Sequence, residues 1–439
     1  MTRRVVVTGA GVVSPLGHSP AALHQALAER RSARRPIELF ATAGIGCHEA
    51  GEIRPFDARA WVGERNLRPL DRTGRLLVVA AQLALADSGW SAELRARHEV
   101  GLVLGTMFCS IRTIAEFDRR GLQLGPTHVS PMDFANSVIN AAAGQAAIWH
   151  GLRGVNSTLA AGEASGLLAI AQAADLIRGG RAAALLAGGA EELCFESFFG
   201  LFRAGRLCGS QDPEDPANIA AAGRARESPI PFDARRNGFS LSEGAALLML
   251  EDAEAAAARG AVVQAELAGH GSAFDTSRGG PAGAAAMARA IRIALDDAGV
   301  SARDVDWVSA SANGSMAGDR NEAAGIAAAL GDHAAGLPVT AVKAMLGEAL
   351  GASGALQAVE LIAGLRDGVL PGILGLEATE DGFPLSGLSA ETRRLPPGAA
   401  RCALATALSA DGHCSALVFA APERQGGDFH AAPSGEGPA

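Results

Sequence analysis

The chain has 439 residues, of which 48% are hydrophobic and 19% charged, a composition typical of a globular protein with a large buried core. No stretch approaches the roughly 18 uninterrupted apolar residues of a membrane span, and the N-terminus lacks the apolar core of a signal peptide, so we expect a cytoplasmic protein without membrane contact. The formal net charge of −9 and the lack of a basic run argue against nucleic acid as a partner.

Strand-like and helical patterns alternate along the chain in two consecutive sets, the second of which begins near residue 260. A buried strand followed by a tight glycine-rich loop is predicted over 4–17. Further strands are expected over 100–106, 182–189, 262–271, 305–312, 402–408 and 415–419, and a loop followed by a strand over 237–250. Helical spacing of apolar residues predicts helices over 20–31, 70–89, 112–120, 164–178, 253–259, 283–298, 320–330 and 351–365.

This alternation predicts an α/β protein built from two similar halves. We place the N-terminal half at residues 1–255 and the C-terminal half at residues 256–422. The remaining residues, 423–439, are rich in glycine, proline and serine, and we expect them to form a disordered tail.

Residue spacing predicts neither a cofactor site nor a metal site. Gly9 and Gly11 begin a dinucleotide-binding pattern, but its third glycine is missing and Pro15 interrupts the helix that should follow. Six cysteines without CxxC spacing read as free, buried thiols: Cys47, Cys109, Cys194, Cys208, Cys402 and Cys414. His413 adjoins Cys414, but neighbours on a strand point to opposite faces, so the two do not form a catalytic pair.

A strand-to-helix elbow is predicted at Glu163. Small residues end the strand at 160–162, and a helical pattern opens directly afterwards. The start of a helix offers unpaired N–H groups and positive potential, which would favour a thiolate nucleophile. Here the side chain is a carboxylate instead, and the only lysine of the chain, Lys343, becomes a second position of interest.

Several motifs occur in a fixed order along the chain. They are 5–17 (VVVTGAGVVSPLG), 187–191 (AGGAE), 232–244 (FDARRNGFSLSEG), 318–322 (GDRNE) and 343–354 (KAMLGEALGASG). In this order and spacing they resemble the β-ketoacyl synthases of fatty-acid and polyketide pathways, over about residues 3–420. The resemblance implies a thiolase-like fold, in which two similar βαβ-type halves form an α-β-α-β-α layered structure. It also implies an acyl carrier protein as partner and no cofactor or metal.

The three catalytic residues of that family are all replaced in this sequence. By resemblance, Glu163 takes the position of the cysteine that carries the acyl chain as a thioester. Asn313 and Glu348 take the positions of the two histidines that stabilise the enolate formed on decarboxylation. The glycine-rich gating loop of the family is also altered, to 408–412 (LSADG). This pattern resembles the chain length factors, ketosynthase-like subunits of type II polyketide synthases that lack the cysteine and most often carry glutamine there.

Two interpretations of the altered pocket remain open. If Glu163, Asn313, Lys343 and Glu348 converge, two carboxylates face one ammonium, and one acid is expected to keep its proton. Such a pair would suit acid/base chemistry on an acyl thioester, in condensation or in malonyl decarboxylation. We favour the alternative, a salt-bridged plug that has replaced the active site and satisfies its own charges. A subunit that only docks the carrier protein is a further possibility.

The favoured reading is a catalytically silent subunit that forms a heterodimer with an active ketosynthase. By resemblance, the strand before the elbow, 156–160, pairs across the dimer axis, and the partner's acyl channel runs toward this interface. A bulkier cap on the channel would shorten the chain that the partner builds. Candidate channel-lining residues, named by location alone, are Phe108, Ile111, Ile114, Phe117, Met132, Phe134 and Ile139. For any single one of them, ordinary core packing is the favoured interpretation.

Overall fold

The computed structural model describes residues 3–64, 67–210, 229–277, 282–396 and 398–422. The predicted tail over 423–439 lies outside the described residues. None of the described helices is long and apolar enough to cross a lipid bilayer.

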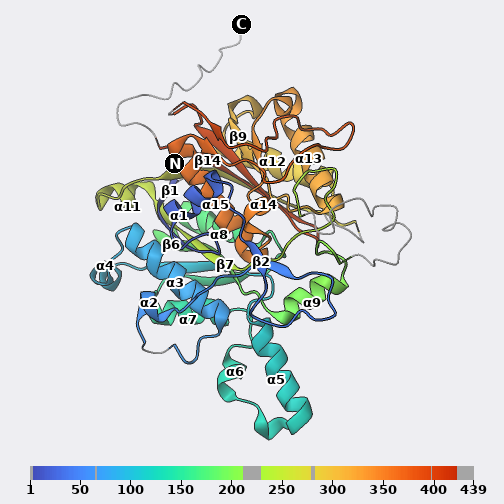
Figure 1. Ribbon diagram of the computed structural model, residues 1–439. Helices are drawn as coiled ribbons and strands as arrows, with labels where there is room; N and C mark the ends of the chain where they lie inside the picture. Colours follow the sequence, from blue (N-terminus) through green and yellow to red (C-terminus); the bar gives the residue numbers. More distant parts are fainter. Residues whose placement is uncertain (1–2, 65–66, 211–228, 278–281, 397, 423–439) are drawn as a thin grey trace.

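The main sheet repeats one strand topology twice (Figure 1). Its N-terminal half consists of β1 (Val5–Val13), β4 (Gly101–Gly105), β5 (Asn156–Leu159), β6 (Ala184–Glu191) and β7 (Gly244–Asp252). Its C-terminal half consists of β8 (Ala265–Phe274), β9 (Trp307–Ser309), β10 (Val339–Thr340), β13 (Cys402–Leu408) and β14 (His413–Ala420). Numbered within its own half, each set of strands stands in the order 3-2-4-5-1. The parallel and antiparallel pairings also correspond, so the prediction of two similar halves is confirmed.

Helices pack between the two halves of the sheet and on their outer faces, which gives the molecule its layers. The described bridge between the halves is short, since only Val6 and Val7 of β1 pair with β8. The central core contains α8 (Ser165–Arg178) and α15 (Ser353–Asp367), which pack between the inner faces of both halves. A second core contains α3 (Arg72–Asp87) and α7 (Ala141–His150), and a third contains α12 (Ala284–Ala298) and α13 (Met316–Leu330). This is the predicted α-β-α-β-α arrangement of a thiolase-like fold.

The glycines near the N-terminus lie inside a strand. The prediction of a loop over them is wrong, because β1 continues through Gly9 and Gly11 as far as Val13. A Cβ atom on Gly11 would lie 2.0 Å from the Ala80 carbonyl oxygen of α3. The glycines therefore allow a helix to approach the strand closely rather than forming a turn.

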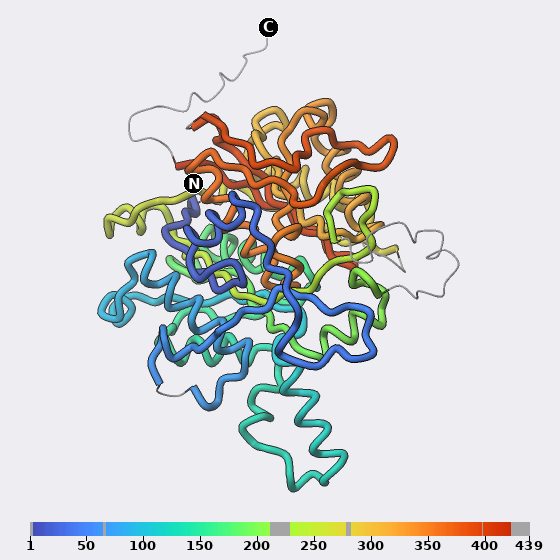
Figure 2. The backbone as a smooth tube through the Cα atoms, viewed as in Figure 1, coloured from blue at the N-terminus to red at the C-terminus, as the bar shows by residue number. Residues whose placement is uncertain are grey.

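Shorter elements complete the fold. They are α1 (Pro20–Ala28), α2 (Arg59–Val62), α4 (Ala92–Arg97), α5 (Ile111–Leu124), α6 (Pro131–Ala135), α9 (Phe195–Arg203), α11 (Ala253–Ala258) and α14 (Lys343–Leu346), with the small ladders β2 (Arg34–Pro36) to β3 (Glu49–Gly51) and β11 (Val369–Leu370) to β12 (Arg393–Arg394). Helices α5 and α6 form an arm that projects from the body of the molecule (Figures 1 and 2). No residue of either helix is buried, so this arm, defined as residues 111–135, has an unusually open surface for its apolar content.

Candidate functional site

The elbow at Glu163 links edge strand β5 to the central helix α8. Gly162 has a φ of +55°, and a Cβ atom there would lie 2.0 Å from the Ser409 hydroxyl oxygen. The Ala161 N–H donates to the Ser165 hydroxyl oxygen at 2.9 Å, which tightens the turn. The elbow therefore packs against the loop that follows β13, and the Glu163 side chain enters a closed space between the two halves.

The Glu163 carboxylate is fully partnered. It is only 3% exposed and forms a 2.6 Å ion pair with the Arg206 guanidinium. The Ser409 hydroxyl donates to its other oxygen at 2.6 Å, and the Ala410 N–H donates to the same oxygen at 3.2 Å. Burial pushes the pKa of Glu163 up, but Arg206, Ser409 and the backbone N–H groups outweigh it and hold the pKa below its ordinary value. Glu163 is therefore an ionised group.

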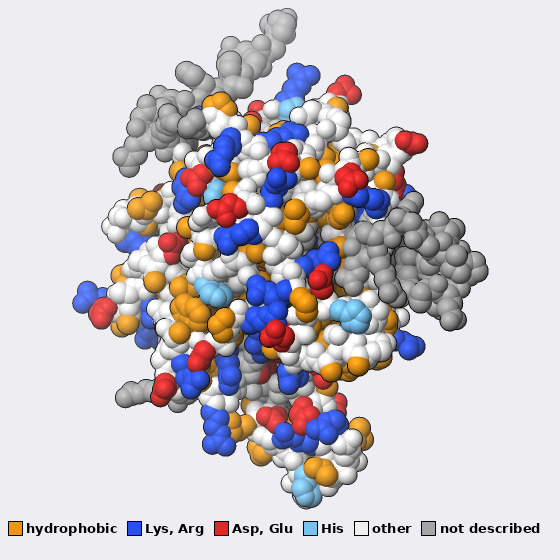
Figure 3. All heavy atoms as spheres, viewed as in Figure 1, with side chains coloured by type: hydrophobic (Ala, Val, Ile, Leu, Met, Phe, Trp, Pro, Cys, Tyr) orange, Lys and Arg blue, Asp and Glu red, His pale blue; other side chains and the backbone are white. Residues whose placement is uncertain are grey.

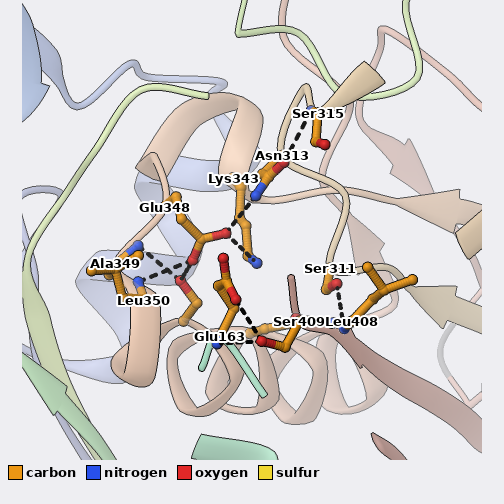
Figure 4. Close-up of polar contacts among 12 residues, drawn as sticks. Glu163, Ser311, Asn313, Ser315, Lys343, Glu348, Ala349, Leu350, Leu408 and Ser409 are labelled. Carbon is orange, nitrogen blue, oxygen red and sulfur yellow. Dashed lines mark hydrogen bonds and ion pairs between the residues drawn. The ribbon is translucent and has the colours of Figure 1, made fainter. Parts of the chain in front are cut away.

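The Glu348 carboxylate has a separate set of partners (Figure 4). It is completely buried and accepts from the Lys343 ammonium at 2.8 Å and from the Asn313 amide at 2.7 Å. The Ser353 hydroxyl donates to its second oxygen at 2.5 Å, and the Leu350 N–H donates there at 3.0 Å. Every oxygen of this carboxylate thus has hydrogen-bond donors, as burial of a charge requires.

The structure brings the four positions singled out by the resemblance together, but their charges are arranged differently from the expectation. Lys343 forms its ion pair with Glu348 rather than with Glu163. Arg206, which the sequence patterns did not single out, supplies the second cation. Two carboxylates therefore face two cations, and Arg206 supplies the positive charge that the expectation of a proton-holding acid left out.

Topology explains why the two carboxylates meet. Glu163 follows β5 and precedes α8, whereas Glu348 follows β10 and precedes α15. Strands β5 and β10 are equivalent in the repeated order, and α8 and α15 are the two central helices. Each half therefore contributes one acid from the same kind of strand-to-helix connection.

Little space remains between these side chains. The cavity lined by Glu163, Arg206, Asn313 and residues of the 408–410 loop has a volume of about 20 Å³. That volume accommodates about one water molecule. An acyl thioester does not fit without movement of the lining residues.

Three further buried acids hold the loops around the pocket. Glu191, in the 187–191 motif, accepts from the N–H groups of Met107, Phe108 and Gly351. Asp319 accepts from the N–H groups of Phe232, Asn313 and Gly314. Burial raises the pKa of Glu191 to about 7 and that of Asp319 to about 6.

Glu322 is the third of these acids, and it accepts from the Ser311 N–H and the Thr406 hydroxyl. Burial raises its pKa as well. Together the three acids account for the motifs at 187–191 and 318–322 as anchors of the backbone.

The seven candidate channel residues do not behave alike. Phe108 packs against a buried core cluster, which fits the interpretation of core packing. Phe117 of α5 and Phe134 of α6 contact each other with ring centroids 5.9 Å apart and tie the arm together. Met132, Phe134 and Ile139 are exposed, and Ile111, Ile114 and Phe117 are partly so. Six of the seven thus lie on or next to the arm surface rather than in the core.

No relocated thiol nucleophile is apparent in the described part of the chain. All six cysteines are buried, as predicted, and Cys109, Cys194, Cys402 and Cys414 are free thiols. Burial raises the pKa of four thiols to about 12: Cys109, Cys194, Cys402 and Cys414. The His413 ring packs edge-on against Phe274, with centroids 4.8 Å apart, while Cys414 is fully buried.

The sequence patterns missed Arg206 as a site residue. Arg206 lies just beyond α9, 43 positions from Glu163, and its guanidinium also stacks over the Phe239 ring at 5.3 Å. No motif marks this position. Ser409 stands in the 408–412 segment, which drew notice only for its departure from a gating loop.

The comparisons with known proteins cover most of the chain. Residues 2–256 match the family model "Beta-ketoacyl synthase, N-terminal domain", and residues 264–377 match "Beta-ketoacyl synthase, C-terminal domain". The tetracenomycin polyketide synthase ketoacyl synthase beta subunit of Streptomyces glaucescens is 34% identical over 94% of this chain and 97% of its own length. The 3-oxoacyl-[acyl-carrier-protein] synthase 2 of Coxiella burnetii is 32% identical over 90% of this chain and 93% of its own length.

Solved structures of the same kind superpose over nearly the whole chain. The ishigamide ketosynthase/chain length factor has a TM-score of 0.87 at 29% identity and covers 96% of this chain and 100% of its own. A type II polyketide synthase acyl-carrier protein in complex with its ketosynthase has a TM-score of 0.84 at 27% identity, with the same coverage. Two matched domains, the repeated topology and the surviving motifs lead to one conclusion: the chain is a member of the β-ketoacyl synthase family.

Proposed function

We propose that the chain is a non-condensing ketosynthase-like subunit that pairs with an active ketosynthase and sets the length of its product, as chain length factors do. One observation carries the proposal. The positions expected to hold the cysteine and the two histidines hold Glu163, Asn313 and Glu348. Glu163 and Glu348 are each ion-paired, and the cavity beside Glu163 and Asn313 has a volume of only about 20 Å³.

The chemistry of this pocket argues against catalysis. Glu163 is ionised, so it cannot serve as a general acid, and its attack on a thioester would produce an anhydride in an uphill step. An enolate formed by decarboxylation would develop negative charge beside the buried Glu348 carboxylate. The acid/base alternative requires a protonated carboxyl in this pocket. The positive charge of Arg206 beside Glu163 favours the ionised carboxylate instead.

The surface of the arm supports association with another subunit. Exposed apolar side chains gather on and beside it: Leu122, Leu124, Met132, Phe134, Val138 and Ile139 (Figure 3). Strand β5 stands at the edge of the sheet and is only partly buried, so its outer edge is open to a partner strand. The two structures named above contain a ketosynthase with a chain length factor and a ketosynthase with its carrier protein, which are the partners proposed here.

Turnover by the isolated chain tests the proposal. The purified protein is supplied with malonyl carrier protein, and released CO2 and condensed products are measured. We expect neither above the rate without protein. Decarboxylation that disappears in Glu163→Ala would replace the proposal with the acid/base enzyme. Carrier-protein binding by the isolated chain, with no effect on any ketosynthase product, would reduce it to a docking subunit.

A further inference from the structure

A large cavity lies at the end of the strands opposite to Glu163. Glu163 follows the carboxyl end of β5, whereas the cavity is lined by residues at or just before the amino ends of β4, β5 and β6. These three strands are parallel, so their amino ends meet at one edge of the sheet and their carboxyl ends at the other. Helices α4 and α11, which Figure 1 shows on one side of the molecule, complete the wall. The cavity is therefore separated from the Glu163 pocket by the length of the strands.

The cavity is wide because small side chains surround it. Its volume is about 640 Å³, which is within the range of small-molecule sites, roughly 300–1,000 Å³. Alanines line it at the start of β6 and on α11: Ala182, Ala183, Ala184, Ala255 and Ala258. Trp90 and Leu94 add larger apolar surface. The wall thus offers apolar contacts to the body of a ligand.

Arginines contribute to the same lining, in a protein of net charge −9. Two of them are already engaged by carboxylates. The Arg259 guanidinium donates to the Glu251 carboxylate at 2.7 Å, and the Arg3 guanidinium lies 3.6 Å from the Asp252 carboxylate. These two pairs fix one side of the cavity, where β7 ends and α11 begins.

Arg153 and Arg181 are the cations that remain for a ligand. Within the part of the chain that the structure describes, neither guanidinium forms an ion pair with a carboxylate, and both side chains are exposed. Arg153 donates to the carbonyl oxygens of Arg95 and Ala96, which holds it at the end of α4. Strand β4 lies between β5 and β6, so the segments that carry Arg153 and Arg181 enter the sheet two strand spacings apart, about 10 Å. Two long side chains at that separation can converge on one anionic group.

An unsatisfied donor lies in the cavity wall. Trp90 is 6% exposed, and its ring lies 5.2 Å from the Arg259 guanidinium and 6.4 Å from the His98 ring. The indole N–H of Trp90 is buried and has no hydrogen-bond acceptor among the described residues. Buried donors are nearly always paired in proteins, so this N–H marks a position where the described residues lack an acceptor.

We propose that this cavity binds an aromatic acid, whose fused rings pack against Trp90 and the alanines and whose carboxylate accepts from Arg153 and Arg181. Guanidinium planes and the indole ring both pack well on aromatic faces, which favours a ring system over a linear chain. A planar carboxylate matches the donor geometry of a guanidinium. The exposed Glu99 also lines the cavity and would repel a polyanion, so a single negative charge fits best. This inference stands apart from the proposed function, because it involves none of the residues of the Glu163 pocket.

Calorimetric titration of the full-length protein tests both parts of the proposed ligand. The probes are 2-naphthoate, its neutral analogue 2-naphthamide, and the linear acid octanoate. We expect 2-naphthoate to bind at least about tenfold more tightly than either, because only it combines a ring system with a charge. Equal binding of the acid and the amide would contradict the role of the arginines. Equal binding of octanoate would contradict the aromatic selectivity, and no detectable binding of 2-naphthoate would overturn the inference.

Three variants locate the binding within the molecule, after thermal unfolding has confirmed that each is folded. Arg181→Gln should remove most of the preference for 2-naphthoate over 2-naphthamide. Arg97→Gln, at an exposed position of α4 outside the cavity lining, is the matched control and should keep it. Ala255→Phe should weaken both ligands, because the larger side chain fills the space beside Trp90. Binding of 2-naphthoate that is unchanged in both Arg181→Gln and Ala255→Phe would place the acid elsewhere on the surface and refute the site.

Discussion

At the scale of single residues, the pocket around Glu163 and Glu348 contains two ion pairs, each with its own hydrogen-bond donors. A buried pair contributes little net stability, because desolvation offsets most of the attraction between the charges. Removal of one partner is different, since it leaves a buried charge uncompensated. Glu163 and Arg206 offer a direct test of this asymmetry, because Glu163 is nearly inaccessible and Arg206 is the cation in contact with it.

We predict that Arg206→Leu lowers the free energy of unfolding by about 3 kcal/mol at pH 7. Wild-type Glu163 has a lowered pKa, so its contribution is present above the unfolded pKa and is lost as pH falls through the folded value. In the variant, burial dominates and the pKa rises, so the deficit should shrink as pH falls toward about 5. Urea unfolding measures both values. The double variant Glu163→Gln/Arg206→Leu should recover most of the loss, and a deficit independent of pH would contradict this account.

Glu192 gives a prediction in which stability depends on pH with the opposite sign to that for Glu163. Its folded pKa, about 8, lies above its ordinary value, so its stabilising contribution is present below the unfolded pKa and is lost as pH rises through about 8. Glu192→Gln removes that loss. From about pH 6 to pH 8.5, the unfolding free energy of the wild type should therefore fall by roughly 1–2 kcal/mol more than that of the variant. Parallel pH profiles of the two proteins in urea unfolding would contradict the buried, protonated state of this carboxyl.

At the scale of elements, the arm is the part of the molecule whose apolar residues are not matched by burial. Helix α5 has apolar residues at helical spacing, yet none of its residues is buried. In a stable monomer such a helix would have packed onto the core. The arm is therefore the element that best fits burial by a second subunit.

Leu122→Glu tests the arm. Leu122 is 88% exposed, so we expect the melting temperature of the isolated chain to change by less than about 2 °C. Co-purification with the active ketosynthase should fall at least about tenfold, because a charge would be buried in the interface. Val262→Glu, at a 79% exposed position just before β8, is the control and should leave pairing intact. Equal effects of the two substitutions would show that the arm has no special role in association.

The sequence predicted most of the elements but not all of their surroundings. Apolar spacing located α3, α8, α12 and α15 to within a few residues, because each packs a broad apolar face into a core. It failed for the glycines of β1, since close approach of a helix and a turn both require glycine. Arg206 could not be found from spacing, because its partner lies 43 positions away and only the folded chain brings them together.

At the scale of the whole molecule, the site lies where two topologically equivalent halves meet. One half contributes Glu163 and the other contributes Asn313, Lys343 and Glu348. The backbone anchors Glu191 and Asp319 lie beside the site. On the proposed function, the architecture of an active site is kept while its reactive groups are replaced. This combination is what a subunit needs if it must match the shape of an active partner without competing for its substrate.

The most direct test of that claim compares two substitutions within the assembled pair. Product formation from malonyl carrier protein is measured for this chain with an active ketosynthase, once with Glu163→Gln in this chain and once with the partner's nucleophilic cysteine changed to alanine. We predict that Glu163→Gln retains the rate within about twofold and that the cysteine change abolishes it. A pair that loses its products with Glu163→Gln, while remaining folded and associated, would show that this chain takes part in the chemistry and would contradict the account.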